Sequence, residues 1–385
     1  MNRITDRERD LVLEVLRAEF HTSTSGFMVR RLEQEFAKKF GVRYAVAHVN
    51  GTATLHSALV AAGVGHGDEV IVPPLTMAST SFAVLQAGAR PVFADVDPDT
   101  FCIDPSSIGK HVTARTRAII PVALYGLSPD MDAIMAIASE HDLVVIEDDA
   151  QCFLGRYKGR LVGTIGHMAS FSFQSSKHMT SGEGGMLVTN DEALADKARR
   201  FGSLGYAAVK AEQGHITKDV IQDPRYERHA SLGWNYRMPD LCAAVALAQL
   251  ERLEDLVQQR IRVAAMYSDA LKGCSWLIPQ RTPEKCVHSY WTFVVRLEND
   301  NRLTWYDFRK KYQEFGGDGI YAAWQLTYLE PAFRQLSSDY ERGLCPVAED
   351  LQPRILQFKT NYFDEKTASR KVEALSKTIA YFDRM

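Results

Sequence analysis

Lys177 stands in the segment SFQSSKHMTSGEGGM (172–186), where small, polar and glycine residues surround a single lysine. The apolar run ASFSFQ just before it is typical of a buried strand, and the glycines after it allow main chain to approach a ligand closely. In a partly desolvated site the pKa of a lysine amine falls, which makes the neutral amine a nucleophile toward carbonyl groups. The alternative is a solvated surface charge, the usual state of a single lysine.

Three adjacent acids, Glu147, Asp148 and Asp149, end the apolar run VVIEDDA (144–150). Neighbouring carboxylates repel one another, and burial of any of them is costly without a cationic partner. A bound cationic group beside Asp148 would meet that need. A solvated strand end with a helix-capping aspartate is the alternative interpretation.

Asn50, Gly51 and Thr52 lie where the β-rich run YAVAHV gives way to a helical pattern. Main-chain N–H groups and the Thr52 hydroxyl at such a helix start form an anion site, although an ordinary N-cap turn would have the same residues. No G-x-x-x-x-G-K-[ST] occurs, and no G-x-G-x-x-G follows a strand, which counts against nucleotide hydrolysis and against an NAD-linked oxidoreductase. A smaller phosphate is the expected anion. An imine-forming amine, an acid for a pyridinium nitrogen and a phosphate cradle are together what pyridoxal 5'-phosphate (PLP) requires.

The elements that must position these residues are seven short apolar runs, mostly separated by helix-length segments. This alternation predicts an α/β fold, a mostly parallel sheet with helices on both faces, in which ligands bind beyond the carboxyl ends of the strands. The runs are YAVAHV, EVIVPP, ARPVFADV, RAIIPVALYG, LVVIEDDA, ASFSFQ and GMLVTND.

The second part of the chain differs in pattern. Residues 205–231 are polar and weakly periodic, and a long helical pattern then runs from Pro239 to about Ala265. Strands such as YWTFVVRL and a last helix follow it. We expect a large PLP-binding α/β domain over residues 1–255 and a smaller α+β domain over residues 256–385.

Composition limits the partners. The 385 residues include 46% apolar ones and carry a formal net charge of −3, which favours neither nucleic acid nor an anionic membrane. No stretch approaches the roughly 18 apolar residues of a membrane span. The six cysteines form no C-x-x-C pair, so neither a metal site nor a disulfide framework is predicted, and a cytoplasmic location fits.

Six segments, taken in order, resemble the fold-type-I sugar aminotransferases, the DegT/StrS type. That family aminates nucleotide-linked keto-sugars and keto-cyclitols. The resemblance begins near residue 25 and covers nearly the whole chain. The segments are VNGTATL (49–55), VIVPPLTMAST (70–80), PVFADVDPDTF (91–101), VVIEDDAQ (144–151), SFSFQSSKHMTSGEGGM (170–186) and GWNYRMPDLCAA (233–244).

The resemblance implies that Lys177 binds PLP as a Schiff base and later moves protons, and that Asp148 pairs with the pyridine nitrogen. It also implies that Gln151 contacts the ring hydroxyl side of the cofactor. The phosphate contacts, by the same resemblance, are Thr52 and Ala53 at the helix start and Ser172 at a strand end. Gly51 is a further candidate cofactor contact, from the anion site at the same helix start.

Asn235 matches a residue that reaches the phosphate from a neighbouring subunit, which implies a homodimer with shared active sites. Met77 stands where relatives usually carry an aromatic ring that stacks on the cofactor, so a thioether contact is expected instead. Ala123 stands where the family often has histidine. Gln174 occupies a variable position and is a candidate substrate contact.

The expected reaction is a ping-pong transfer of an amino group from glutamate or glutamine to a keto-sugar or keto-cyclitol. His288, Tyr321 and Trp324 are further candidate substrate contacts, with a plain core role as the alternative. A PLP-dependent sugar dehydratase of the same family is one rival, but such relatives have histidine in place of the lysine. A non-catalytic ligand-binding protein of the PLP fold is the other.

Overall fold

The computed structural model describes residues 3–20, 27–211, 219, 222–298 and 303–384. Its centre is a seven-stranded sheet with the order β1-β9-β8-β5-β4-β2-β3. The polar segment expected at 205–231 lies partly outside the described residues. The strands of this sheet are β1 (Tyr44–His48), β2 (Glu69–Val72), β3 (Arg90–Phe93), β4 (Thr116–Ile119), β5 (Val144–Asp148), β8 (Met168–Ser172) and β9 (Gly185–Thr189).

Six of these strands run in the same direction, and β9 alone pairs antiparallel with both of its neighbours. The prediction of a mostly parallel sheet is confirmed, and each of the seven apolar runs supplies one strand. Both faces are buried, because alternate residues along one strand enter different apolar clusters. Val46 packs with one cluster, whereas Ala45 and Ala47 pack with another.

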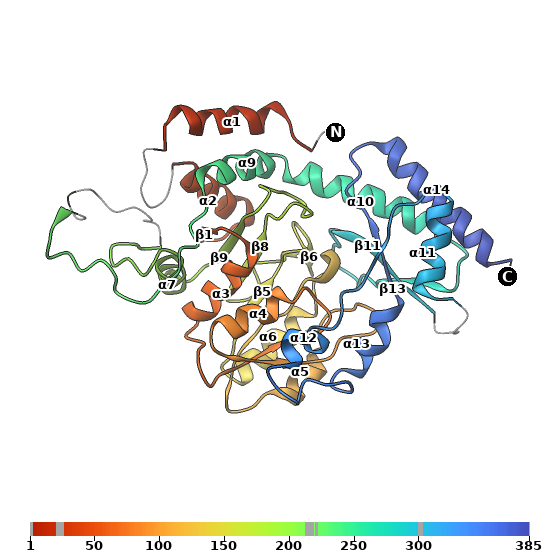
Figure 1. Ribbon diagram of the computed structural model, residues 1–385, viewed down its shortest axis with the longest axis horizontal. Coiled ribbons are helices and arrows are strands. Elements are labelled where there is room, and N and C mark those ends of the chain that lie inside the picture. The colour runs from red at the N-terminus through yellow and green to blue at the C-terminus, as the bar shows by residue number, and fades with distance from the viewer. Residues whose placement is uncertain (1–2, 21–26, 212–218, 220–221, 299–302, 385) are drawn as a thin grey trace.

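Helices cover both faces of the sheet (Figure 1). One face carries α3 (Gly51–Ala61), α4 (Ser79–Gln86) and α7 (Glu192–Gly202). The other carries α2 (Phe27–Phe40) and α9 (Asp240–Glu251) over one half, and α5 (Pro105–His111) and α6 (Met131–Glu140) over the other. α1 (Asp6–Arg17) packs on α9. The small hairpin of β6 (Arg156–Tyr157) and β7 (Arg160–Leu161) completes this part.

The long helical pattern after Pro239 forms two helices instead of one. α9 ends at Glu251 and α10 (Leu253–Ala270) begins after Arg252, whose backbone (φ −122°, ψ 25°) leaves the helical region. The Arg252 side chain donates to Glu8 at 2.7 Å, which ties the break to α1. α10 then runs from the large sheet to the C-terminal part of the molecule (Figure 1).

The C-terminal part is built on a four-stranded antiparallel sheet with the order β10-β11-β13-β12. Its apolar cluster includes residues of α10, α11 and α14. Residues 327–351, by contrast, pack on the large sheet, where the N–H of Thr327 donates to the carbonyl of Pro74 at 3.1 Å. The boundary between a large and a small domain at residue 255 stays a prediction. The elements are β10 (Leu277–Pro279), β11 (Thr292–Leu297), α11 (Trp305–Glu314), β12 (Tyr321–Ala322), α12 (Pro331–Arg334), α13 (Pro346–Leu351), β13 (Ile355–Lys359) and α14 (Glu365–Phe382).

Among the described residues, none of the helices combines the length and apolar character that crossing a membrane requires.

Candidate active site

Three chain segments meet at the carboxyl end of the large sheet. Asp148 ends β5, Ser172 ends β8, and Gly51 begins α3 directly after β1. β5 and β8 are parallel neighbours, with Asp148 opposite Ser170, so the two strand ends lie at the same edge. The Asn50 side chain caps α3 by accepting from the N–H of Ala53 at 2.8 Å.

A cavity of about 320 Å³ lies at this edge. That volume is in the range of small-molecule sites. Nine predicted site residues line it together: Gly51, Thr52, Met77, Asp148, Gln151, Ser172, Gln174, Lys177 and Trp324.

The three acids at the end of β5 are stabilised in three different ways. Glu147 accepts hydrogen bonds from the N–H groups of Gly163, Ile165 and Gly166, between 2.6 and 2.9 Å. Asp148 accepts from the Thr80 hydroxyl at 2.7 Å and from the N–H of Ala150 at 3.2 Å. Within the described part of the chain, both carboxyl oxygens of the buried Asp149 lack a hydrogen-bond partner.

These surroundings affect the pKa values of Asp148 and Asp149 differently. Burial raises the pKa of Asp148, but its two hydrogen bonds and the charge of Lys177 oppose the rise. Burial and the charges of Glu147 and Asp148 raise the pKa of Asp149 well above its usual value. Asp148 thus lines the cavity, and the charge of Lys177 favours its ionised form. The surroundings of Asp149 favour its neutral form.

The Lys177 amine faces the same cavity and lies 4.7 Å above the centre of the Trp291 ring. Its side chain is partly exposed to the cavity, although protein surrounds the amine. Burial lowers the pKa of Lys177 to about 8; Asp148 and Glu183 oppose this shift, and Arg260 adds to it. Compared with an ordinary lysine, a larger fraction of the amine is therefore neutral and nucleophilic near neutral pH.

Close backbone packing holds the helix start beside the Lys177 loop. A Cβ on Gly185 would come within 2.7 Å of the Asn50 carbonyl group, and a Cβ on Gly51 would lie 3.0 Å from the Cβ of Ser172. Glycine at both positions lets β9 and β8 approach the first turn of α3. In that turn the N–H groups of Ala53 and Thr54 donate to Asn50. Those of Gly51 and Thr52 have no hydrogen-bond partner among the described residues, so they are available to an anion.

Other predicted residues lie outside the first cavity. Ala53 is buried in the first turn of α3, where its N–H is used by the cap. Asn235 is exposed and forms a β-bridge with Ser203. His288 is buried and bonded: its Nε2 lies 3.0 Å from Oε1 of Gln280, its Nδ1 accepts from the N–H of Tyr290, and burial lowers its pKa to about 3.

Gln151 lines the cavity and also holds the main chain beside it. Its Oε1 accepts from the N–H of Tyr125 at 2.8 Å, in the short turn Leu124–Gly126 where Tyr125 has φ 62°. The neighbouring Ala123, at the position where relatives often carry histidine, is buried. An Ala side chain there contributes no polar group.

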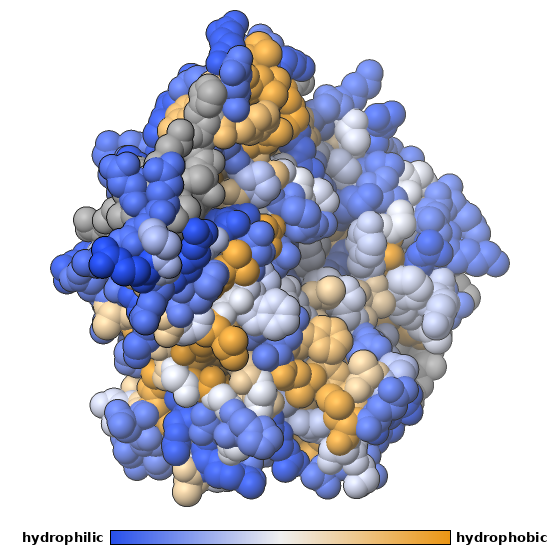
Figure 2. Space-filling view, turned by 60° about the vertical axis from the view of Figure 1, so that its left-hand side comes forward, coloured by the Kyte–Doolittle hydropathy of each residue, from blue (hydrophilic) through white to orange (hydrophobic). Residues whose placement is uncertain are grey.

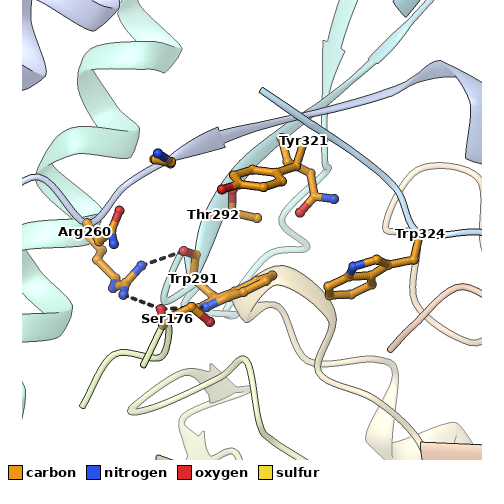
Figure 3. A pocket seen from close by; sticks show the side chains of 9 residues that line it. Ser176, Arg260, Trp291, Thr292, Tyr321 and Trp324 are labelled. Atoms are coloured by element: carbon orange, nitrogen blue, oxygen red, sulfur yellow. Dashed lines mark hydrogen bonds between the residues drawn. The ribbon is translucent and has the colours of Figure 1, made fainter. Parts of the chain in front are cut away.

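A second cavity of about 300 Å³ adjoins the first, because Ser176, Trp291 and Trp324 line both. The two tryptophan rings are stacked with centroids 6.1 Å apart (Figure 3). Tyr321 is 58% exposed and faces this space. The remaining lining residues come mainly from β11, β13 and the chain after it: Thr292, Gln357, Lys359 and Asn361, with Arg260 from α10.

The sequence did not single out Thr80, Trp291 or Arg260 as site residues. Thr80 stands in the segment 70–80 that carries the resemblance, and its hydroxyl was the available signal. Arg260 interrupts the apolar stripe of α10 between Val257 and Ala264, which is an unusual place for a charge. Nothing in the sequence signalled that Trp291 belongs to the site, because only the fold brings it to Lys177.

In the described parts of the chain, no group of three or more His, Cys, Asp or Glu residues could hold a metal ion.

Comparison with known proteins decides what this arrangement is. The sequence model of the DegT/DnrJ/EryC1/StrS aminotransferase family matches residues 2–374. The chain belongs to this family.

Two relatives are GDP-perosamine synthases. The protein from Escherichia coli O157:H7 is 36% identical over 349 residues, covering 90% of this chain and 88% of the relative. The protein from Caulobacter vibrioides is 40% identical over 299 residues, covering 77% and 76%. The solved structure of an aminotransferase from Psychrobacter cryohalolentis superimposes with a TM-score of 0.89 at 33% identity, covering 99% of this chain and 98% of the other.

The protein is a PLP-dependent aminotransferase, as the resemblance predicted. The side chains and main chain that line its cavity also fit the cofactor. The amine of Lys177 suits an aldehyde, the buried carboxylate of Asp148 suits a ring N–H, and the first turn of α3 with Ser172 suits a phosphate.

Proposed function

We propose that this aminotransferase moves an amino group from glutamate or glutamine to a keto-sugar, joined to a nucleotide, or to a keto-cyclitol. The observation that carries the proposal is the Lys177 amine, which faces a cavity shared with Asp148 and opens toward a second, aromatic cavity. The names of the two GDP-perosamine synthases support a nucleotide-linked acceptor.

Each residue has a task in this proposal. Bound PLP supplies a carbonyl carbon for condensation with amines and a conjugated ring that accepts electrons. Asp148 would hold a proton on the ring nitrogen, since the hydrogen bonds from Thr80 and Ala150 favour its charged form and fix its position. Ser172 and the first turn of α3, including Thr52, bind the phosphate. Gln151, held by the N–H of Tyr125, would contact the ring hydroxyl of the cofactor.

Lys177 holds the cofactor between turnovers and moves the proton once a donor has freed its amine. A base that has to accept a proton from a carbon atom must be neutral, and the lowered pKa of about 8 supports this role. The Trp291 ring covers the amine at 4.7 Å and excludes water from that side.

The second cavity is the proposed site for the part of the acceptor beyond the reacting carbon. Trp324 and Tyr321 offer ring faces to a sugar, and Gln174 is a candidate contact in the first cavity. The contacts of His288 favour support of the chain near Gln280 over direct substrate binding.

The test is a panel of nucleotide-linked keto-sugars and inososes with purified protein. Glutamate or glutamine should bleach the visible absorbance of the bound cofactor, and a correct acceptor should restore it with release of its aminated product. A dehydratase would release a dehydrated sugar instead. Absorbance that no amino donor bleaches would contradict transfer and favour a ligand-binding protein.

We also propose a homodimer with shared active sites. Asn235 is exposed, and beside it Leu232 and Trp234 are 93% and 55% exposed, which supports burial against a second copy. Apolar patches are visible in Figure 2, which brings forward the side that carries α7 in Figure 1. Chains with Lys177→Ala and with Asn235→Ala, each inactive alone, should regain activity when mixed; verified heterodimers without activity would exclude sharing.

A cytoplasmic location is part of the proposal. All six cysteines are free, three of them buried, and none is within a disulfide. Free thiols are typical of a reducing compartment. Cell fractionation with an antibody to the chain would test this location.

A further inference from the structure

Arg260 ties α10 to the main chain of the lysine loop. Its buried guanidinium donates from Nη2 to the carbonyls of Ser176 and Lys177, both at 2.9 Å. From Nη1 it donates to the carbonyl of Trp291 at 2.7 Å and to the Thr360 hydroxyl at 3.2 Å. One side chain thus joins the loop of the large sheet to β11 and β13 of the small one (Figure 3).

Trp291 makes a second connection between the same parts. Its indole N–H donates to the Ser176 carbonyl at 3.0 Å, so that carbonyl receives two hydrogen bonds. The face of the same ring lies 4.7 Å from the Lys177 amine. The backbone before Lys177 and the amine at its other end are therefore both fixed against Trp291.

The charge of Arg260 is not matched by an acid among its hydrogen-bond partners. Its four hydrogen bonds go to neutral oxygens, and none goes to a carboxylate. A buried cation with only neutral partners is costly. The two N–H groups of a neutral amide could satisfy at most two of these four oxygens. Burial lowers the pKa of Arg260 to about 9, so the guanidinium is still charged at neutral pH.

Four charged or titratable groups bear on the Lys177 amine. Asp148 and Glu183 favour its charged form, and Arg260 disfavours it. His178 is neutral, because burial holds its pKa well below the usual value. Arg3 bears on Arg260 with like charge. Arg260 is therefore the cation among these neighbours that acts directly against protonation of the amine.

We infer that Arg260 is a positioning residue for Lys177: with Trp291 it fixes the lysine loop against the small sheet, and it places a positive charge against the Lys177 main chain that disfavours protonation of the amine. The inference rests on the proposed role of Lys177.

The charge is tested with Arg260→Gln, Arg260→Lys and the control Arg262→Gln, an exposed arginine on the same helix. The readout in the holoenzyme is the pH midpoint of the visible absorbance, which reports protonation at the Lys177 nitrogen. Removal of a nearby cation stabilises the protonated form, so Arg260→Gln should raise the midpoint by about one pKa unit. Arg260→Lys and the control should keep it. Equal shifts in both Arg260 variants would point to solvent entry and overturn the electrostatic role.

The positioning is tested by turnover. Arg260→Lys keeps the charge but cannot reach two carbonyls with a planar fork, and Trp291→Phe keeps a ring but loses the N–H. Both should lower kcat by about tenfold at little change in the KM of the donor. Wild-type turnover in both variants would overturn the positioning role, and it would do so even where Arg260→Gln does not fold.

A separate result distinguishes this inference from the proposed function. If Lys177→Ala keeps the visible absorbance and transfers amino groups, the proposed role of Lys177 is wrong. If Lys177 is required but all Arg260 and Trp291 variants behave like Arg262→Gln, the inference about Arg260 alone is wrong.

Discussion

The two cavities of this protein are built in different ways. The first is formed by strand ends, a helix start and a glycine-bounded loop, and its groups sit within a few residues of the main-chain features that hold them. The second is formed mainly by side chains on and next to β11, β12 and β13, more than one hundred residues further along the chain, together with Ser176 and Arg260. Cofactor chemistry thus rests on backbone geometry, and acceptor recognition on side chains.

This difference has a physical consequence. A change in the first cavity disturbs close backbone contacts, such as that of Gly185 with Asn50, or leaves a buried acid without its partner. A change in the second alters aromatic and amide groups that are partly open to solvent. Substitutions in the first cavity should therefore affect every substrate, and those in the second should affect only the acceptor.

The largest effect is expected for Lys177→Ala. Loss of the amine removes both the attachment of the cofactor and the base, so transfer should fall by a factor on the order of 10³ or more, with loss of the visible absorbance. Lys110→Ala, at an exposed lysine, is the control. The control should keep its activity. Transfer by Lys177→Ala would contradict the assignment of the cofactor chemistry to the first cavity.

Asp148→Asn should have the next largest effect. The amide cannot support a protonated ring nitrogen, so both half-reactions should slow by about a hundredfold while part of the cofactor stays bound. Stopped-flow absorbance with the donor alone and with the acceptor alone measures this. A loss confined to the acceptor half-reaction would contradict the assignment of Asp148 to the first cavity.

Trp324→Ala tests the second cavity. Loss of a stacked ring face should raise the KM for the keto acceptor by about tenfold. Trp324 also touches the first cavity, so Tyr321→Ala, which lines only the second, should show the cleaner separation. Rates of the donor half-reaction should stay unchanged in the Tyr321 variant. Tyr306→Ala, at a 77% exposed ring on α11, is the control.

Asp149→Asn should change stability with pH more than activity. The raised pKa of Asp149 means that the folded chain keeps a proton which the unfolded chain releases above about pH 4. Stability is therefore lost as pH rises from there toward the folded pKa. The variant lacks this loss, so its thermal midpoint should exceed that of the wild type increasingly toward higher pH. Asp10→Asn, at an exposed acid of α1, should show no such trend.

The smallest effect is expected for Met77→Phe. Met77 lines the first cavity and is 50% exposed, at the position where relatives usually have a stacking ring. A ring there should tighten cofactor binding by about threefold, since an aromatic stack adds roughly 0.5–1.5 kcal/mol. Release of the cofactor during dialysis measures this. Faster release would mean that the thioether fits the site better than a ring.

Much of the first cavity could be predicted from sequence because its residues follow recognisable strands. Asp148 and Ser172 lie in apolar runs and end the strands β5 and β8, and Lys177 follows five residues after Ser172. The carboxyl ends of parallel strands meet at one edge, so local pattern is enough to bring such residues together. The seven strands were predicted from the same kind of local pattern.

The rest depends on contacts that local pattern does not encode. The break between α9 and α10 at Arg252 has neither glycine nor proline, and it follows from docking against α1. Trp291 reaches Lys177 only because β11 pairs within the small sheet. Asp149 and Asp148 are identical in type and adjacent in sequence, and only the structure distinguishes the acid with partners from the one without.

The reversed strand β9 has a further consequence. β8 and β9 pair until Ser172 faces Gly185, so residues 173–184 form a loop whose two ends are held by the same rung of the ladder. Adding or deleting one residue there would change the orientation of Lys177 or break that rung. Anyone who transplants new acceptor preferences onto this scaffold should copy the loop without gaps and vary the neighbourhood of Tyr321 instead.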